Sequence, residues 1–207
     1  MSIIKLNNNS VKNVTAFGSL TSGSMTFISK TTISSPVSSV QFTSGIDNTY
    51  KEYLFYFVNL HPNSNSEPDI RMNFSIDGGS NYNVTKTTTA FYARHAENGD
   101  FASMAYEPDS DLSQSTANQA VGLNMESDND GSLVGYLHLF NPSSTTFAKH
   151  FIMETAYMHD YPAAWTQKYG GYINTTSAVN AVSFIGEYAE NQSGNIDAGT
   201  IILYGIN

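Results

Sequence analysis

The chain has no cysteine among its 207 residues, so disulfide bonds, thiolate metal ligands and a cysteine nucleophile are excluded. Basic residues are also scarce, because nine Lys and Arg stand against eighteen Asp and Glu and the formal net charge is −9. Such a chain lacks the positive surface that follows a phosphate backbone or an anionic membrane. We therefore expect neither nucleic acid nor a membrane as a partner.

Long apolar runs and helical periods are missing as well. The opening residues MSIIKLNNNS are too short an apolar run for a signal peptide, and no stretch of about 20 apolar residues could span a bilayer. Only 13% of the residues are charged, and the Ala-, Leu-, Glu- and Lys-rich periods that support helices are absent. Neither export by a signal peptide nor an α-helical fold is expected.

The residues that are abundant favour β structure. Asn, Ser, Thr and Gly supply turns and β-branched positions, while 13 Tyr and 12 Phe can fill a substantial core. The length suits one domain, and the spacing of the apolar segments predicts about ten strands in two packed antiparallel sheets. We expect strands near residues 26–33, 38–43, 52–60, 70–76, 83–92, 120–124, 132–140, 149–157, 169–174, 179–185 and 200–206.

Two of these segments make sharper predictions. Apolar and polar residues alternate from Asp69 to Ile76, which predicts a strand with one buried face and one face toward water. Residues 53–58, YLFYFV, are apolar at every position, so both faces of that strand should be covered. A covered second face indicates a homo-oligomer, and we predict a trimer.

Residues 1–23 show no sustained period and are predicted to be an N-terminal arm preceding a sandwich domain at 24–207. The arm is expected to attach the domain to a larger particle through its apolar side chains, Ile3, Ile4, Leu6, Val11, Val14 and Phe17.

Metal chemistry has one weak candidate. Glu126, Asp128, Asp130 and Gly131 imitate the start of an EF-hand loop, but Leu137 stands where a bidentate glutamate is required. A solvated acidic turn is the preferred interpretation, with no metal and no cofactor expected. The five histidines, His61, His95, His138, His150 and His159, have no zinc-ligand spacing. His138 and His150 are expected to be hydrogen-bonded structural residues beside aromatic rings.

Enzymatic signatures are equally sparse, since neither a G-x-S-x-G elbow nor a phosphate-binding loop occurs. A carboxylate pair for glycoside cleavage would leave no local motif and stays open, but we expect a non-enzyme. Tyr157, Tyr161, Trp165, Tyr169 and Tyr172 form the most suggestive binding segment. Exposed rings of this kind contact sugars, whereas buried ones would be core or interface. We predict glycan or receptor contact in loops at 94–118 and 157–172, with Tyr157, Tyr161, Trp165 and Tyr169 as contact residues.

Five segments resemble a family of small virion structural proteins of marine tailed bacteriophages: FTSGIDNTYKEYLF (42–55), SIDGGSNYNVTKTTT (75–89), YLHLFNPSSTTFAKHFI (136–152), NTTSAVNAVSF (174–184) and SGNIDAGTIILYGIN (193–207). In these segments Asp77, Gly78 and Gly79 suit a turn with positive φ, and Asn141 with Pro142 suits a strand break. The resemblance implies a jelly-roll-like component of a virion, such as a tail or head appendage that meets the host surface. A capsid decoration protein and a carbohydrate-binding module remain alternatives.

Overall fold

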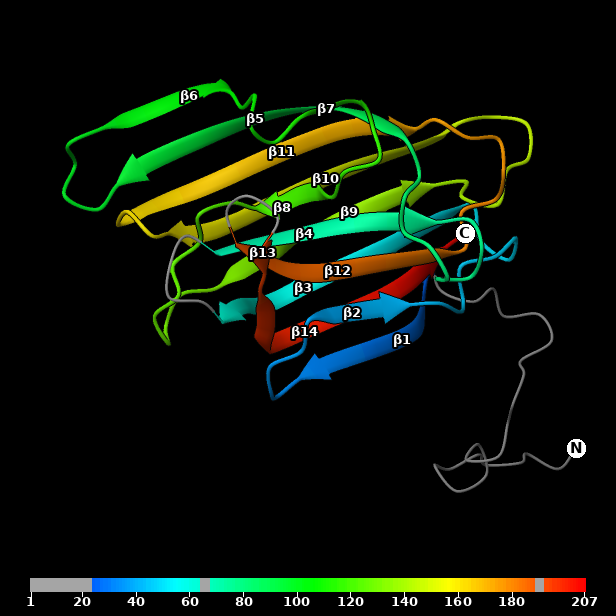
Figure 1. Ribbon diagram of the computed structural model, residues 1–207, viewed down its shortest axis with the longest axis horizontal. Helices are drawn as coiled ribbons and strands as arrows, with labels where there is room; N and C mark the ends of the chain where they lie inside the picture. The colour runs from blue at the N-terminus through cyan, green and yellow to red at the C-terminus, as the bar shows by residue number, and fades with distance from the viewer. Residues whose placement is uncertain (1–23, 64–67, 189–191) are drawn as a thin grey trace, which may run out of the picture.

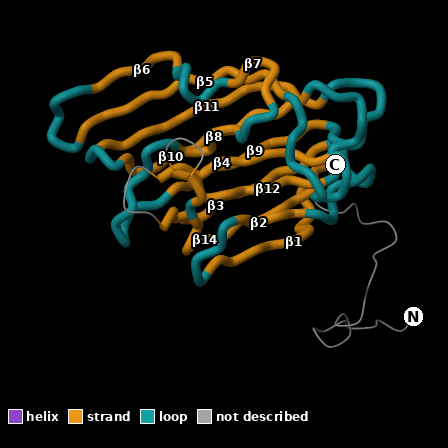
Figure 2. Tube along the Cα trace, in the orientation of Figure 1, coloured by secondary structure: helices purple, strands orange, loops and turns teal. Residues whose placement is uncertain are grey.

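The computed structural model describes residues 24–63, 68–188 and 192–207. Two antiparallel sheets pack face to face, with the smaller sheet in front of the larger one in Figure 1. Every regular element in the described ranges is a strand (Figure 2). No helix there is long and apolar enough to cross a membrane. The prediction of an all-β antiparallel sandwich is confirmed, and the arrangement is compatible with a jelly-roll-like fold.

The larger sheet has nine strands. In spatial order its path is β1 (Met25–Ile33), β14 (Asn195–Ile206), β3 (Glu52–Asn63), β9 (Leu133–Phe140), β10 (Lys149–His159), β11 (Ala163–Ile173), β5 (Lys86–Ala96) and β6 (Ala102–Tyr106), with β7 (Leu112–Ser115) also paired with β5.

The smaller sheet has five strands. Its path is β13 (Gln192–Ser193), β12 (Ala181–Tyr188), β4 (Pro68–Ser75) and β8 (Gln119–Gly122), with β2 (Ser39–Phe42) also paired with β12.

The core lies between the two sheets. On the larger sheet, Phe55, Leu137 and Met153 belong to one row of paired residues that points inward. On the smaller sheet, Phe184 packs edge-on against Phe55, with ring centroids 5.6 Å apart. Aromatic side chains bury large apolar areas, and edge-to-face pairs add a specific geometry. The Tyr- and Phe-rich composition therefore fills the space that links the two sheets.

The predicted strands form, but several differ in extent: β14 begins at Asn195 rather than Thr200, and β5 runs over Lys86–Ala96 rather than 83–92. The predicted loop at 94–118 contains β6 and β7, and β11 begins at Ala163 rather than Tyr169. The predicted loop at 157–172 is therefore mostly the β10–β11 hairpin, whose strands pair from Lys149–Ile173 to His159–Ala163. The first six residues of β11 were missed because two alanines and a tryptophan do not form a β-branched run.

The prediction that β4 turns one face to water is wrong. Asp69, Asn73 and Ser75 are buried although they alternate with the inward-facing apolar residues. The reason is that another segment crosses this face, because the Asn73 amide donates to the carbonyl oxygen of Thr116 and to Asn118 Oδ1, each at 3.0 Å. Polar residues on the outer side of this strand therefore meet one another instead of water.

The two-sided apolar strand is covered only in part by the chain itself. Tyr53, Phe55 and Phe57 are buried on the inner face of β3, and Leu54 is buried on the outer face. Val58, also on the outer face, is 44% exposed. The expected trimer is not tested by these contacts. The predicted arm at 1–23, with all of its attachment residues, lies outside the described residues.

The sandwich has two different ends, which we name by their connections. The turn end carries the β2–β3, β4–β5, β9–β10 and β11–β12 connections and the C-terminus, at the right in Figure 1. The Asn207 N–H donates to the carbonyl oxygen of Ser24, so the described chain begins and ends there. The pocket end, at the left, carries the β5–β6, β8–β9 and β10–β11 connections.

Both predicted turn features are found at the turn end. Gly78 and Gly79 have φ of 72° and 91°, and Asn141 has φ of 45° just before Pro142. Positive φ costs glycine little, and asparagine tolerates it better than most residues do. All five segments that carry the resemblance to phage proteins reach or form this end.

Candidate functional site

A polar pocket of about 700 Å³ opens at the pocket end. It lies between the first residues of β4 and the part of the larger sheet formed by β10, β11 and β5. Its lining combines acidic, basic, amide and aromatic side chains: Asp69, Arg71, Arg94, Glu107, Asp109, Leu123, Asn124, His159 and Trp165. Pockets of this volume are of the size that holds small organic ligands.

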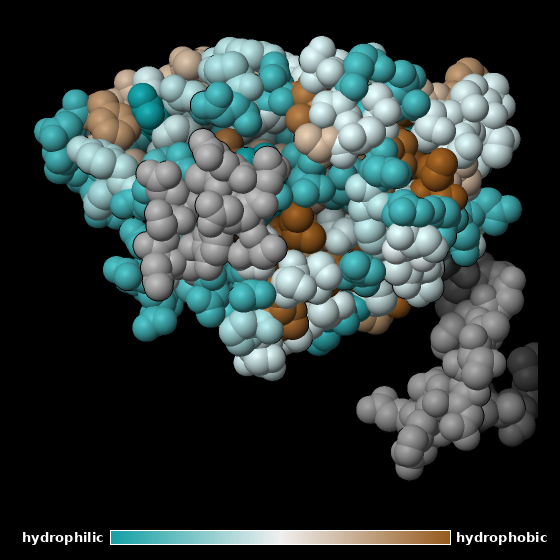
Figure 3. Space-filling model, viewed as in Figure 1, coloured by the Kyte–Doolittle hydropathy of each residue, from teal (hydrophilic) through white to brown (hydrophobic). Residues whose placement is uncertain are grey.

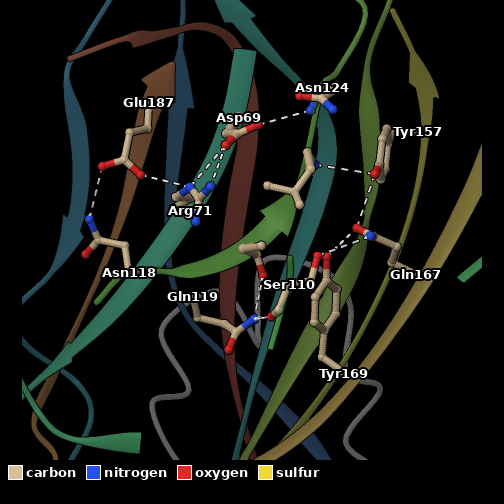
Figure 4. A network of polar contacts seen from close by, with 12 residues as sticks. Asp69, Arg71, Ser110, Asn118, Gln119, Asn124, Tyr157, Gln167, Tyr169 and Glu187 are labelled. Carbon is tan, nitrogen blue, oxygen red and sulfur yellow. Dashed lines mark hydrogen bonds and ion pairs between the residues drawn. The ribbon is translucent and has the colours of Figure 1, made fainter. Parts of the chain in front are cut away.

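Arg71 forms the charged base of the pocket. Its guanidinium bonds to Asp69 at 2.7 Å and to Glu187 at 2.8 Å, so one cation lies between two carboxylates (Figure 4). Burial raises the pKa of Asp69, and the neighbouring Arg71 charge opposes this shift. The pKa of Glu187 is raised for the same reason and opposed by the same guanidinium. Asp69 also accepts the Asn124 backbone N–H at 3.0 Å, so both of its oxygens are occupied.

A second polar cluster lies behind this base, inside the sandwich. Tyr157 and Tyr169 both donate their hydroxyls to Gln167 Oε1, the first at 3.1 Å (Figure 4). The Gln167 amide in turn donates to Ser110 Oγ at 3.3 Å. Burial raises the pKa values of both tyrosines, so their hydroxyls stay protonated donors. A buried network with its members satisfied fixes the side chains that form it.

Trp165 forms a wall of the pocket and is only 8% exposed. Tyr92 from β5 stacks at a centroid distance of 4.7 Å, and His159 from β10 stacks at 4.5 Å. Because β5 and β10 flank β11 on opposite sides, these two rings cover opposite faces of the indole. Most of the indole is therefore covered by neighbouring rings, and little of it is open to the pocket.

Arg94 and Glu107 complete the mouth of the pocket. The Arg94 guanidinium lies 5.2 Å from the Trp165 ring and 4.9 Å from the Phe101 ring. Its Nε donates to Ser103 Oγ at 3.0 Å. Glu107 is half-buried, and burial raises the pKa of its carboxyl group. Together these groups offer hydrogen-bond donors and acceptors at one opening, which suits a ligand with several hydroxyl groups.

The predicted aromatic contact residues separate into two groups. Tyr157, Trp165 and Tyr169 are buried, so the expectation that they form an exposed contact surface is wrong, and the core interpretation holds for them. Tyr161 is 50% exposed, and its ring lies 5.5 Å from Phe101. Tyr172 is half-buried and does not line the polar pocket. Its hydroxyl oxygen accepts a hydrogen bond from Gln114 Nε2 at 3.0 Å.

The structure does bring together the two predicted recognition regions. The Glu97 N–H donates to the carbonyl oxygen of Pro162 at 3.0 Å, which joins the β5–β6 turn to the β10–β11 turn. Tyr161 and Phe101 stand at this junction beside the pocket. The charged lining was missed by sequence reasoning, because Arg71 and Arg94 lie in different sheets and Glu107 lies in the β6–β7 connection. These residues line one pocket only because the two sheets pack together, and they carry no local motif.

The acidic turn and His138 have structural partners, whereas His150 is exposed and its ring lies 6.3 Å from that of Tyr172. Glu126 Oε1 accepts the backbone N–H groups of Ser127 and Asp128, so that carboxylate closes its own turn. His138 bonds to Glu52 at 2.8 Å, and its ring lies 4.2 Å from Phe140, as expected for a structural histidine. Across residues 24–63, 68–188 and 192–207, no three His, Asp or Glu side chains cluster in a way that could hold a metal ion.

No family model, curated protein or solved structure matches this chain. The resemblance to phage virion proteins therefore rests on the five sequence segments alone.

Proposed function

We propose that this protein is a structural component of a tailed-phage virion, an appendage module that binds a host-surface glycan at its pocket end. The observation that carries the proposal is the separation of the two ends. The described chain begins and ends at the turn end, whereas the polar pocket and the Tyr161–Phe101 pair lie at the other end. Attachment through residues before Ser24 would leave the pocket end free to meet a host.

The chemistry of the pocket supports a saccharide ligand. Sugar rings present hydroxyl groups to polar side chains and C–H surfaces to aromatic rings. Arg94, Glu107 and Asn124 of the lining supply the polar groups. Tyr161, outside the lining but packed against Phe101, supplies an aromatic side chain that is half exposed. The stack of Tyr92, Trp165 and His159 holds these groups in place, and Trp165 and His159 also line the pocket themselves. Loops carried on a rigid sandwich are a common location for recognition.

The proposal is tested with purified surface polysaccharide of the host bacterium and the full-length protein in isothermal titration calorimetry. We expect Tyr161→Ala to weaken binding by about tenfold, the effect of losing one aromatic contact worth about 1 to 2 kcal/mol. Phe147→Ala is the matched control, because Phe147 is 68% exposed but lies at the turn end. Both variants should melt like the wild type.

Immunogold labelling of purified particles tests the virion location separately. Gold at a tail or head appendage supports the proposal, whereas particles without label, or a regular label over the whole capsid shell, contradict it. Polysaccharide binding that Tyr161→Ala leaves unchanged would contradict the assignment of the pocket end.

A further inference from the structure

The outer face of the larger sheet, the side turned away from the smaller sheet, gathers most of the exposed apolar side chains. Twelve large hydrophobic residues in the described part of the chain are exposed, and all but Ile76, Phe147 and Tyr161 lie on this face. They extend from Phe27 on β1 to Met104 on β6, which is 76% exposed. The side with the smaller sheet differs, because its described surface shows only small separate hydrophobic patches (Figure 3).

Strand register places these side chains in rows across the sheet. Phe27 pairs with Tyr204, Tyr204 with Leu54, Leu54 with His138, and His138 with Ile152. Directly paired residues point to the same face, so this row runs unbroken over five strands. Ile152, in the middle of the sheet, is 51% exposed. The face is thus continuous and is not a set of isolated apolar residues.

The charges in the regularly paired part of this face balance. Four Lys and Glu side chains lie there, Lys30, Glu52, Glu154 and Lys168, and their formal charges sum to zero. Asp197, at a bulge of β14, bonds to His61 at 2.6 Å. Lys168 bonds to Glu154 at 3.1 Å, and Glu52 bonds to His138 at 2.8 Å. The whole chain has a net charge of −9, so two copies that meet through most other surfaces bring like charges together. The outer face avoids that repulsion.

The size of the face also matches a stable interface. Eight strands about 4.8 Å apart, each with about eight residues at 3.3 Å, cover roughly 900 Å². A standard protein interface buries about 800 Å² per partner. Two identical twisted sheets can pack face to face at about −30° with their side chains interdigitated.

We propose that a second copy of this chain packs against the outer face of the larger sheet. This interface is separate from the pocket, because the pocket opens on the opposite side of β10, β11 and β5. It explains why one surface of an acidic protein is both apolar and neutral. Because the face of one copy meets the same face of the other, the contact has two-fold symmetry and joins two copies.

Sedimentation velocity of the full-length protein gives the decisive measurement. We expect a mass above the 22.6 kDa of one chain for the wild type. Ile152→Glu should raise the dissociation constant by about thirtyfold or more, because it places a carboxylate in the centre of an apolar contact. Phe147→Glu is the matched control, since it adds the same charge to an exposed aromatic position outside the face, and it should leave the mass unchanged.

Lys168→Glu provides a second variant that does not alter the apolar surface. Lys168 has a side chain that is 49% exposed, so its replacement should not prevent folding. The change makes the face negative, and the association should weaken at low salt and recover at high salt. A monomeric wild type would overturn the proposal. An oligomer that both Ile152→Glu and Lys168→Glu leave intact would overturn it equally.

Discussion

At the pocket end two buried carboxylates contact a partly exposed guanidinium, whereas at the turn end two buried lysine ammonium groups donate to amide oxygens. Arg71 lies between Asp69 and Glu187. Lys86 donates to Asn73 Oδ1 at 2.9 Å, and Lys149 donates to the carbonyl oxygen of Thr175 at 3.0 Å. Both arrangements satisfy hydrogen bonds, but only the first compensates charge.

The difference appears in the direction of the pKa shifts. Burial lowers the pKa of Lys86 to about 8 and also lowers that of Lys149, because desolvation disfavours the charged amine. At the pocket end the shifts of the two carboxyl groups are opposed by Arg71. The stability of the pocket end therefore depends on the intact ion pair. The contribution of the turn end to stability depends instead on pH, in the range above neutrality where its buried lysines lose their protons.

Removing Arg71 should have the largest effect. In Arg71→Met two carboxylates remain in a buried site without their cation, and breaking a buried pair in this way costs about 3 to 5 kcal/mol of unfolding free energy. The folded-state pKa values of Asp69 and Glu187 then rise further above their unfolded values. Stability should fall as pH rises through that range, so part of the loss returns in mild acid.

Urea denaturation at acidic and neutral pH measures this change. The double variant Arg71→Met/Glu187→Gln is the control, because it removes one of the uncompensated charges and should recover part of the stability. A loss below about 1 kcal/mol that does not vary with pH would contradict the role given to the ion pair.

Removing the buried amine at the turn end should act in the opposite direction. Lys86 is fully buried, and its folded pKa of about 8 lies below the ordinary 10.5. The unfolded chain binds the proton more strongly between these values, so wild-type stability should rise with pH from about 8 to about 10.5. Lys86→Met should raise the unfolding free energy at neutral pH by about 1 to 3 kcal/mol and abolish that rise.

The matched control is Lys168→Met, a lysine with an exposed side chain on the same sheet. Lys168→Met should show the same rise in stability with pH as the wild type. Thermal unfolding followed between neutral and alkaline pH distinguishes the two variants. If Lys86→Met keeps the rise in stability, the buried amine is not its source.

The sequence predicts the scaffold better than the site, and particular strands show why. The segment around 53–58 is apolar at every position, and β3 forms there as expected, because fully apolar runs report burial directly. In β4 the alternation correctly predicts a strand, but the exposure of its polar face depends on Thr116 and Asn118, which reach it from a distant segment. Local periodicity carries no information about such a covering segment.

The candidate site depends almost wholly on contacts between residues that are distant in the sequence. Trp165 reads as an exposed aromatic residue in a loop, yet strand pairing places it between Tyr92 and His159. Trp165, Gln167 and Tyr169 are buried with a period of two in the structure, but Gln167 is polar, so the sequence showed no apolar alternation that would predict the early start of β11. The meeting of Arg71 with Glu187 had no local signal either, because it follows from the register of β4 against β12.

The smallest expected effect concerns Asp77 in the exposed turn between β4 and β5. Its carboxylate accepts hydrogen bonds from Ser75 Oγ at 2.7 Å and from the Asn81 backbone and side chain at 2.9 and 2.7 Å. These bonds lower the pKa of Asp77 from 3.8 to about 2. The stability that these bonds give is present above the pKa of Asp77 in the unfolded chain and is lost as pH falls toward about 2.

Asp77→Asn tests this contribution. One acceptor oxygen becomes a donor that faces the Asn81 amide, so the melting temperature should drop by no more than about 2 to 4 °C at neutral pH. The gap between variant and wild type should close in acid. Asp130→Asn, at an exposed position of the pocket end, is the control. It should change neither the melting temperature at neutral pH nor its dependence on pH. A gap that persists unchanged at the lowest pH would mean that the turn gains nothing from the charge of Asp77.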